Sequence, residues 1–262
     1  MTAGLHATDR AVLRVSGPEA REFLQNLVTN DVGRLGEGAV YAALLTPQGK
    51  YLFDFFLVAD GETILIDVAA DRAEALARRL AMYRLRAKVD LDVTDLAVVV
   101  GIGPLPDVPL VFADPRLAAL GWRAYGADAA SILAGIRPLD QEELTVLRVA
   151  HVVPETGVEL IPDESYILEM GFERLHGVDF RKGCYVGQEV TARMKHKTEL
   201  RKGLVRVTVA GDAPAPGTEI RSGEKTVGTL LTSAGGAGLA YLRFDRAGGD
   251  LTAGHARVRT ET

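Results

Sequence analysis

The sequence predicts an α+β protein whose chain ends in a small all-β domain. Within residues 11–101 the patterns run strand, helix, strand, hairpin, helix, strand, which differs from the regular βαβ repeat of a parallel sheet. After Leu204 they change to short strand-like runs separated by glycine-containing turns, which is typical of a barrel or sandwich. The 262 residues are 47% hydrophobic and 25% charged, a composition that folded proteins have and disordered chains lack.

Local patterns place the elements of the N-terminal part. The Ser-x-x-Glu spacing of Ser16 and Glu19 is that of a capping box and predicts a helix beginning there. Asp60-Gly61 predicts a tight hairpin turn, and apolar residues at helical spacing predict a second helix after Asp71. Apolar or alternating runs predict strands at residues 11–15, 40–45, 51–59, 63–68 and 91–101.

The second half contains the predicted domain boundaries. A Gly- and Pro-rich connector at residues 103–110 is a possible boundary between two sub-domains of the N-terminal domain. It is followed by short strands, a weak helix at 128–133 and a helix beginning near Asp140. We place the main boundary near Thr198, which gives an α+β domain of residues 1–198 and a β-barrel-like domain of residues 199–262.

Composition limits the function. A single cysteine excludes an internal disulfide framework, and five histidines without ligand spacing make a metal site or a cluster held by this chain alone unexpected. No signal or transit peptide and no bilayer-length apolar run are recognisable. The formal net charge of −5 argues against general DNA binding. We therefore predict a cytoplasmic monomer with no metal, membrane or DNA partner.

The candidate site is the stretch from Arg181 to Glu189, which holds the only cysteine, Cys184. Glycines four residues apart bracket the cysteine and allow a sharp bend that brings backbone close to a ligand. Residues 171–203 contain eight Lys or Arg and four Asp or Glu, an excess that suits an anion. Two ordinary explanations stay open, a buried and inert cysteine and a solvated basic face.

The motif Lys182-Gly183-Cys184-Tyr185, followed by Gly187-Gln188-Glu189 and Arg193, resembles the signature of the YgfZ family. Members of that family are folate-binding relatives of the glycine-cleavage T protein, an aminomethyltransferase. Residues 13–32 and 45–54 also resemble the opening and central hairpin of the T-protein fold. The resemblance thus covers most of the chain and implies a GcvT-like folate-binding fold followed by the barrel-like domain.

The resemblance also implies ligands, partners and a function. The ligand would be tetrahydrofolate or another folate derivative. The function would be assembly or repair of Fe–S clusters, with Fe–S client or assembly proteins as partners, including enzymes that modify tRNA.

Individual roles carry over from the same resemblance. Cys184 would be the functional thiol, with Asp54 and Lys182 as the other catalytic candidates. Asp54 matches an aspartate beside the reactive nitrogen of tetrahydrofolate, and Glu169 matches a glutamate that binds the pterin ring. The implied folate-binding residues are Asp54, Arg148, Glu169, Tyr185, Gln188 and Arg193.

Structural explanations of these residues stay open as well. Asp54 could pair with an arginine such as Arg84 or Arg86. Glu169 could be a helix-surface charge, and Glu189 with Arg193 a pair one helical turn apart.

Two other functions also stay open. The first is a scaffold without chemistry, in which folate stabilises a docking surface and bases bind an acidic partner; those bases are Arg193, Lys195, Lys197, Arg201 and Lys202. The second is a one-carbon transferase of the T-protein type, so whether the protein is an enzyme is undecided. The glycine-rich stretch is not a Walker A motif, because Gly-Lys-Ser/Thr does not follow at the required spacing.

Overall fold

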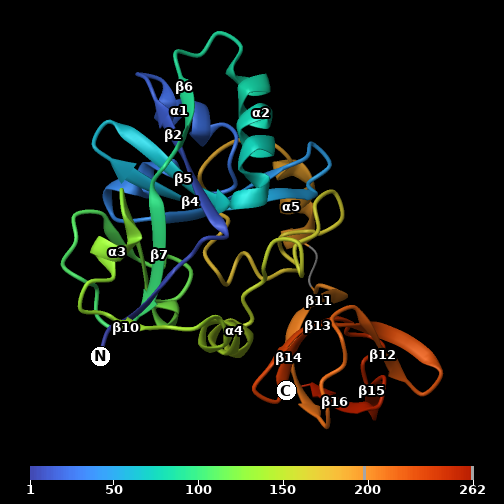
Figure 1. The fold of residues 1–262 in the computed structure, drawn as a ribbon. Coiled ribbons are helices and arrows are strands. Elements are labelled where there is room, and N and C mark those ends of the chain that lie inside the picture. The colour runs from blue at the N-terminus through green and yellow to red at the C-terminus, as the bar shows by residue number, and fades with distance from the viewer. Residues whose placement is uncertain (197–198, 261–262) are drawn as a thin grey trace. The chain divides into compact units, whose positions relative to one another are not determined.

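The computed structural model describes residues 1–196 and 199–260, and the chain divides into two compact units (Figure 1). The first unit comprises residues 1–140 and 173–188, and the second comprises residues 141–172 and 189–262. The chain therefore enters the second unit, returns to the first for residues 173–188, and leaves it again. The boundary predicted near Thr198, and Lys197 of the proposed basic surface, lie outside the described residues.

Two five-stranded sheets form the framework of the first unit. One sheet has the order β3-β4-β5-β2-β6, with β2 at Arg10–Ser16, β3 at Val40–Leu45, β4 at Tyr51–Asp60, β5 at Thr63–Ala69 and β6 at Asp90–Thr94. The other has the order β10-β1-β7-β9-β8, with β1 at Ala3–His6, β7 at Ala97–Ile102, β8 at Val111–Ala113, β9 at Trp122–Gly126 and β10 at Arg137–Pro138. Short helices lie in the connections between elements of the same sheet: η1 (Val32–Gly36), η2 (Ala70–Arg72), η3 (Ala118–Leu120) and α3 (Ala129–Ile132).

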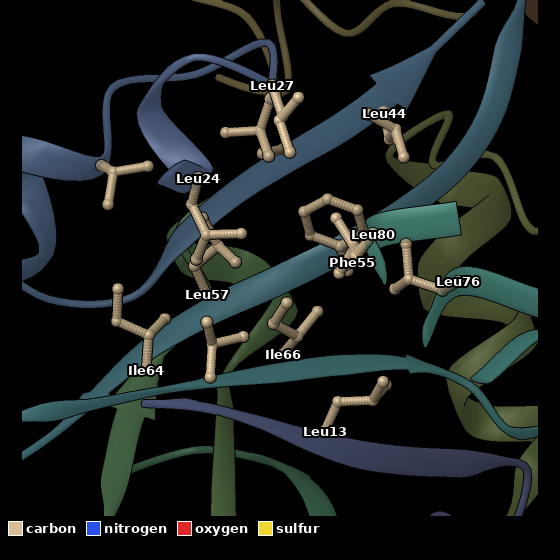
Figure 2. Packing of buried hydrophobic residues seen from close by; sticks show 14 of the residues in the cluster. Leu13, Leu24, Leu27, Leu44, Phe55, Leu57, Ile64, Ile66, Leu76 and Leu80 are labelled. Atoms are coloured by element: carbon tan, nitrogen blue, oxygen red, sulfur yellow. The ribbon is translucent and has the colours of Figure 1, made fainter. Parts of the chain in front are cut away.

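The first sheet is buried on both faces. On one face, helices α1 (Ala20–Gln25) and α2 (Ala73–Arg84) complete a core in which Leu24, Leu76 and Leu80 pack with Phe55 (Figure 2). The other face packs against the second sheet through a separate cluster that includes Val58 and Tyr125. Because side chains alternate along a strand, β4 sends apolar residues into both clusters, which explains its long apolar run.

The structure corrects one prediction for the N-terminal part and adds a strand that was not predicted. Ser16 is the last residue of β2, and the cap of α1 is Glu19, whose side chain makes no capping hydrogen bond. The carboxylate of Glu19 instead accepts from the backbone N–H of Lys88, 3.1 Å away, so the predicted capping box is wrong. Strand β1 was not predicted, because its four residues show no clear alternation.

The second unit consists of helices and a closed six-stranded barrel. Helix α4 is Gln141–Ala150 and helix α5 is Gln188–His196, whose first residue belongs to the first unit. The barrel has the order β11-β14-β13-β12-β15-β16, with β11 at Lys202–Ala210, β12 at Thr218–Ser222, β13 at Lys225–Ala234, β14 at Ala237–Arg243, β15 at Leu251–Ala253 and β16 at Ala256–Thr260. The predicted C-terminal all-β barrel is confirmed.

None of the helices within residues 1–196 and 199–260 combines the length and the apolar character that crossing a bilayer would require.

Candidate functional site

The segment that carries Cys184, residues 176–188, is held by the chain that follows α1. The hydroxyl of Thr29 donates to the carbonyl of Gly177 at 2.7 Å, and the backbone N–H of Asp179 donates to the carbonyl of Thr29 at 3.0 Å. The side-chain amide of Asn30 donates to the carbonyl of His176 at 2.6 Å and to that of Tyr41 at 2.7 Å. Buried polar side chains thus fasten this segment, called the cysteine loop below, to strand β3.

Lys182 anchors the centre of the cysteine loop. Its Nζ donates to the backbone carbonyls of Gln25, the last residue of α1, and of Val28, three residues further on, each 2.5 Å away. Carbonyls at a helix C-terminus lack intrahelical donors, so a lysine satisfies them well. Burial lowers the pKa of the ammonium to about 8, although Asp31 and Asp179 act to raise it. These two hydrogen bonds give Lys182 a structural role, and its catalytic role stays a prediction.

Gly187 seats the end of the cysteine loop on the turn between β3 and β4. Its φ is +81°, and a Cβ there would lie 2.5 Å from the carbonyl oxygen of Thr46 and 3.0 Å from the Cα of Gly49. Gly183 has a φ of +96° but no atom within 4 Å of such a Cβ. Gly187 is therefore required by close packing and by backbone conformation, whereas Gly183 is required by conformation alone.

Between these anchors the loop presents Cys184 to solvent. The next residue, Tyr185, is only 7% exposed, and its backbone N–H donates to Oε1 of Gln188 at 3.2 Å. Val186 packs against the apolar core that α1 and α2 complete. The explanation of Cys184 as a buried, inert residue is therefore wrong, since the thiol is exposed on a segment whose neighbours are fixed.

Asp54, on β4, is buried and held by two phenols. The hydroxyl of Tyr41 donates to Oδ2 at 2.9 Å, and that of Tyr51 donates to Oδ1 at 2.8 Å. Burial, and then the charge of Asp54, raise the pKa of Tyr41 well above its ordinary value, so Tyr41 remains a donor at neutral pH. Arg84, considered from sequence as a partner of Asp54, instead donates to the carbonyl of Val89 at 3.5 Å.

Sequence reasoning missed both tyrosines, and the reason is a β-bulge. Regular alternation would place Tyr51 and Asp54 on opposite faces of β4, because they are three residues apart. The pairing of β3 with β4 shifts register between Leu44 and Leu45, so that two residues of β4 oppose one of β3. A bulge of this kind turns a side chain to the other face. No local pattern in the sequence marks it.

A group of arginines lies beside this carboxylate on the face toward the second sheet. Arg116 stacks over Tyr41, with 5.3 Å from Cζ to the ring centroid, and over Phe56 at 4.8 Å. Asp114 holds Arg116 through a salt bridge of 2.7 Å. Arg123 stacks over Phe56 at 4.1 Å. Positive charge is thus placed over aromatic rings next to Asp54, a second feature that the sequence did not indicate.

Three of the predicted ligand residues belong to the second unit. Arg148 bridges Glu159 at 2.8 Å and Glu155 at 3.0 Å, and its Nη2 donates to Thr232 at 2.7 Å. Glu169 accepts from the hydroxyl of Tyr241 at 2.6 Å. The third, Arg193, lies on α5. The folate set inferred from sequence therefore divides between the units, with Asp54, Tyr185 and Gln188 in the first and Arg148, Glu169 and Arg193 in the second.

The chemistry of these residues fits a folate in part. A pterin presents adjacent N–H donors, and a carboxylate can accept two of them. Arg148 fits less well, because its guanidinium already serves Glu159, Glu155 and Thr232. Within residues 1–196 and 199–260 no group of three or more His, Cys, Asp or Glu side chains could hold a metal ion.

Comparisons with known proteins extend this picture. A family model described as the C-terminal beta-barrel domain of CAF17 matches residues 201–262. The crystal structure of the glycine cleavage system aminomethyltransferase T from Bartonella henselae superposes with a TM-score of 0.82, over 99% of this chain and 84% of that one. At 15% identity this likeness concerns the fold alone, and it confirms the predicted GcvT-like fold.

Several curated relatives carry the name iron-sulfur cluster assembly factor IBA57, mitochondrial, or its homolog. The mouse protein (Mus musculus) is 31% identical over 280 residues, which are 92% of this chain and 78% of the relative. The human protein (Homo sapiens) is 30% identical over 276 residues, with the same two shares. The homolog of Pyricularia oryzae is 32% identical over 232 residues, which are 82% of this chain, and the chain spans 60% of that relative's length. These mitochondrial relatives contradict the predicted cytoplasmic localisation.

Proposed function

The chain belongs to the IBA57 family, a relative of the YgfZ family, and from this we propose that it acts in the assembly or repair of iron–sulfur clusters through the thiol of Cys184. The relatives are named for iron-sulfur cluster assembly, and the fold is that of the glycine cleavage system aminomethyltransferase T. Fe–S client or assembly proteins are the corresponding partners.

The exposure of Cys184 on an anchored loop is the observation that carries this proposal. A thiolate is the form of cysteine that binds iron or attacks an electrophile. The contacts of Lys182 and Gly187 hold the backbone on both sides of Cys184, so that the sulfur meets a partner in a defined position. One thiol supplies one ligand, whereas a cluster needs several. The remaining ligands would come from the partner.

We further propose that tetrahydrofolate binds to this protein. The buried carboxylate of Asp54, with the Tyr41 and Tyr51 donors beside it, supports this role, and so does the resemblance of the motifs. When bound, the folate would supply a pterin edge and a polyanionic tail. Asp54, Tyr185 and Gln188, which all lie in the first unit, are the residues proposed to hold it.

Complementation by a Cys184→Ala variant tests the role of the thiol. Cells that lack the protein are supplied with the wild type, with Cys184→Ala or with the exposed control Thr8→Ala, and the activity of Fe–S enzymes is measured. We expect Thr8→Ala to restore activity and Cys184→Ala to fail although it accumulates as a folded protein. Full activity with folded Cys184→Ala would overturn the proposed thiol role.

Folate binding has a separate test. Trp122 is the only tryptophan and lies in the first unit, so calorimetry and indole fluorescence can both follow a titration with tetrahydrofolate. Asp54→Asn should weaken binding at least about tenfold, since it removes a charge-assisted acceptor worth about 1.5–3 kcal/mol. A wild-type protein that binds no tetrahydrofolate would end the folate proposal and leave the thiol proposal intact.

A further inference from the structure

The far end of α2 exposes apolar side chains that the folded chain does not cover. Met82 is 68% exposed and Leu85, directly after the helix, is 89% exposed. Large apolar residues that are exposed next to one another indicate an interaction surface, whereas single exposed ones are common. In Figure 1 the turn that joins α2 to β6 extends beyond the helix end. We call this surface the α2-end patch and define it as Arg78, Met82, Arg84, Leu85, Arg86 and Lys88, all of which are exposed.

The α2-end patch is strongly basic in an acidic protein. Residues 75–89 contain five Lys or Arg and no Asp or Glu, whereas the whole chain carries a formal charge of −5. Arg78 pairs with Glu74 at 3.2 Å, one helical turn earlier, which leaves the positive excess concentrated after residue 80. The patch therefore combines two exposed apolar side chains with an excess of positive charge, on a protein whose net charge is negative.

The turn that carries the patch is fixed to the body of the first unit. The backbone N–H of Lys88 donates to the carboxylate of Glu19 at 3.1 Å. Val89 is buried in the core that α1 and α2 complete. A Cβ on Gly17 would lie 2.3 Å from the carbonyl oxygen of Lys88, so the two backbones are in close contact. The exposure of Leu85 is thus a feature of an anchored turn.

Leu85 also adopts a backbone conformation that leucine disfavours. Its φ is +42° and its ψ is −100°, and the N–H of Ala87 donates to the carbonyl of Arg84 at 2.7 Å. These values are close to the first central position of a type II′ turn, where glycine is preferred. A glycine would fit with less strain and would expose no apolar surface. Strain of this kind is characteristic of positions selected for function.

We propose that the α2-end patch is a docking surface for an acidic protein that offers an apolar pocket inside a rim of carboxylates. Met82 and Leu85 are the apolar anchors, because the few side chains that are fully desolvated at the centre of an interface contribute most of its affinity. Arg84, Arg86 and Lys88 pair with the carboxylates of the rim, which arginine binds in bidentate geometry. The patch shares no residue with the cysteine loop or the folate set, so it adds a second contact to the proposed function.

The test uses the full chain and a defined probe. The probe is a fluorescein-labelled helical peptide in which Glu and Leu alternate at three- and four-residue spacing, and binding is followed by anisotropy. A peptide of equal charge, with Ser in place of each Leu, reports attraction by charge alone. We expect the Glu/Leu peptide to bind at least about tenfold more tightly than the Glu/Ser peptide, and Met82→Ser/Leu85→Ser to remove that difference. Leu105→Ser, at another exposed leucine of the first unit, is the control and should leave it unchanged.

Leu85→Gly separates a docking role from a structural one. Because glycine fits the turn, this variant should raise the Tm by about 2–4 °C while it lowers the affinity for the Glu/Leu peptide several-fold. A Tm that falls, or an unchanged affinity, would overturn the proposal.

Two further probes distinguish other occupants. Sedimentation with phosphatidylserine vesicles and titration with duplex RNA are run on the wild type and on Met82→Ser/Leu85→Ser. Vesicle binding that depends on Met82 and Leu85, or RNA binding tighter than that of the Glu/Leu peptide, would contradict a protein partner. The expected result is that neither vesicles nor RNA bind in a manner that these two residues control.

Discussion

At the scale of single residues, Lys182 shows how surroundings decide a role. The residue before the Gly-Cys pair suggested catalysis from sequence, and its pKa, lowered to about 8 chiefly by burial, is compatible with proton transfer. Its two bonds to the carbonyls of Gln25 and Val28 nevertheless give it a structural function. Only the geometry reveals that function, because the acceptors are more than 150 residues earlier in the chain.

Replacing Lys182 should change both stability and its dependence on pH. Lys182→Met leaves two carbonyls without their donor, which we expect to lower the free energy of unfolding by about 1–3 kcal/mol. In the folded protein the lysine pKa is about 8, below the ordinary 10.5, so between these values the unfolded chain binds more protons. The free energy of unfolding contributed by this group therefore rises with pH from about 8 to 10.5.

Urea unfolding of the wild type and Lys182→Met at pH 7, 8.5 and 10 measures this effect. The gap between the two proteins should widen toward pH 10, because only the wild type gains stability from Lys182. Parallel pH profiles would show that the ammonium is not buried as described.

The exposure of Cys184 predicts a second residue-scale result. The folded protein, without denaturant, should react with one equivalent of a thiol reagent such as dithionitrobenzoate, because it has one cysteine and that cysteine is exposed. Cys184→Ser should alter the free energy of unfolding by less than about 0.5 kcal/mol, as exposed substitutions do. Labelling that requires denaturant would contradict the exposed position.

At the scale of elements, the β3–β4 hairpin and the cysteine loop determine each other. Gly187 packs on the hairpin turn at Thr46 and Gly49, and the bulge in the same hairpin turns Tyr51 toward Asp54. The sequence predicted both strands and the turn between them. It did not predict the bulge or the packing of the loop, since each depends on chain segments that only folding brings together.

A matched pair of glycine variants tests the packing of the cysteine loop. Gly183→Ala imposes only the cost of a positive φ, about 1–2 kcal/mol. Gly187→Ala adds a clash with the backbone of the hairpin turn. It should therefore lower the free energy of unfolding by about 1 kcal/mol more than Gly183→Ala does. Thermal unfolding measures the difference, and equal losses in the two variants would show that the loop does not rest on the hairpin.

At the scale of the whole molecule, the two sheets of the first unit are joined through one buried carboxylate. Asp67 on β5 bonds to Arg10 at 2.7 Å, to Arg123 on β9 at 2.6 Å and to the hydroxyl of Tyr125 at 3.0 Å. Burial alone would raise the pKa of Asp67, but the charges of Arg10 and Arg123 outweigh it and lower the pKa. A buried ion pair adds little net stability, yet loss of one partner is costly.

Asp67→Asn should therefore destabilise the first unit by about 3–5 kcal/mol, because two guanidinium groups remain buried without their counter-charge. Since the pKa of Asp67 is lower in the folded state, its contribution is present above the unfolded value of 3.8 and is lost as the pH falls below it. Acid unfolding of the wild type should begin below about pH 4. An Asp67→Asn protein as stable as the wild type at pH 7 would contradict this account.

The sequence by itself determined the class of the fold and most of its longer elements. Alternation in β3 to β5, the helical spacing in α2 and the glycine turns of the barrel are local, so one stretch of chain is enough to specify each. The motif around Cys184 could likewise be identified from sequence, because its glycines and charged residues are close together in the chain. Tertiary structure alone decided that Lys182 is an anchor, that Tyr41 and Tyr51 hold Asp54, and that Arg148 serves Glu159. The burial of a side chain, the register of paired strands and the desolvation of a charge all depend on residues distant in the chain. They are therefore fixed only when the protein folds.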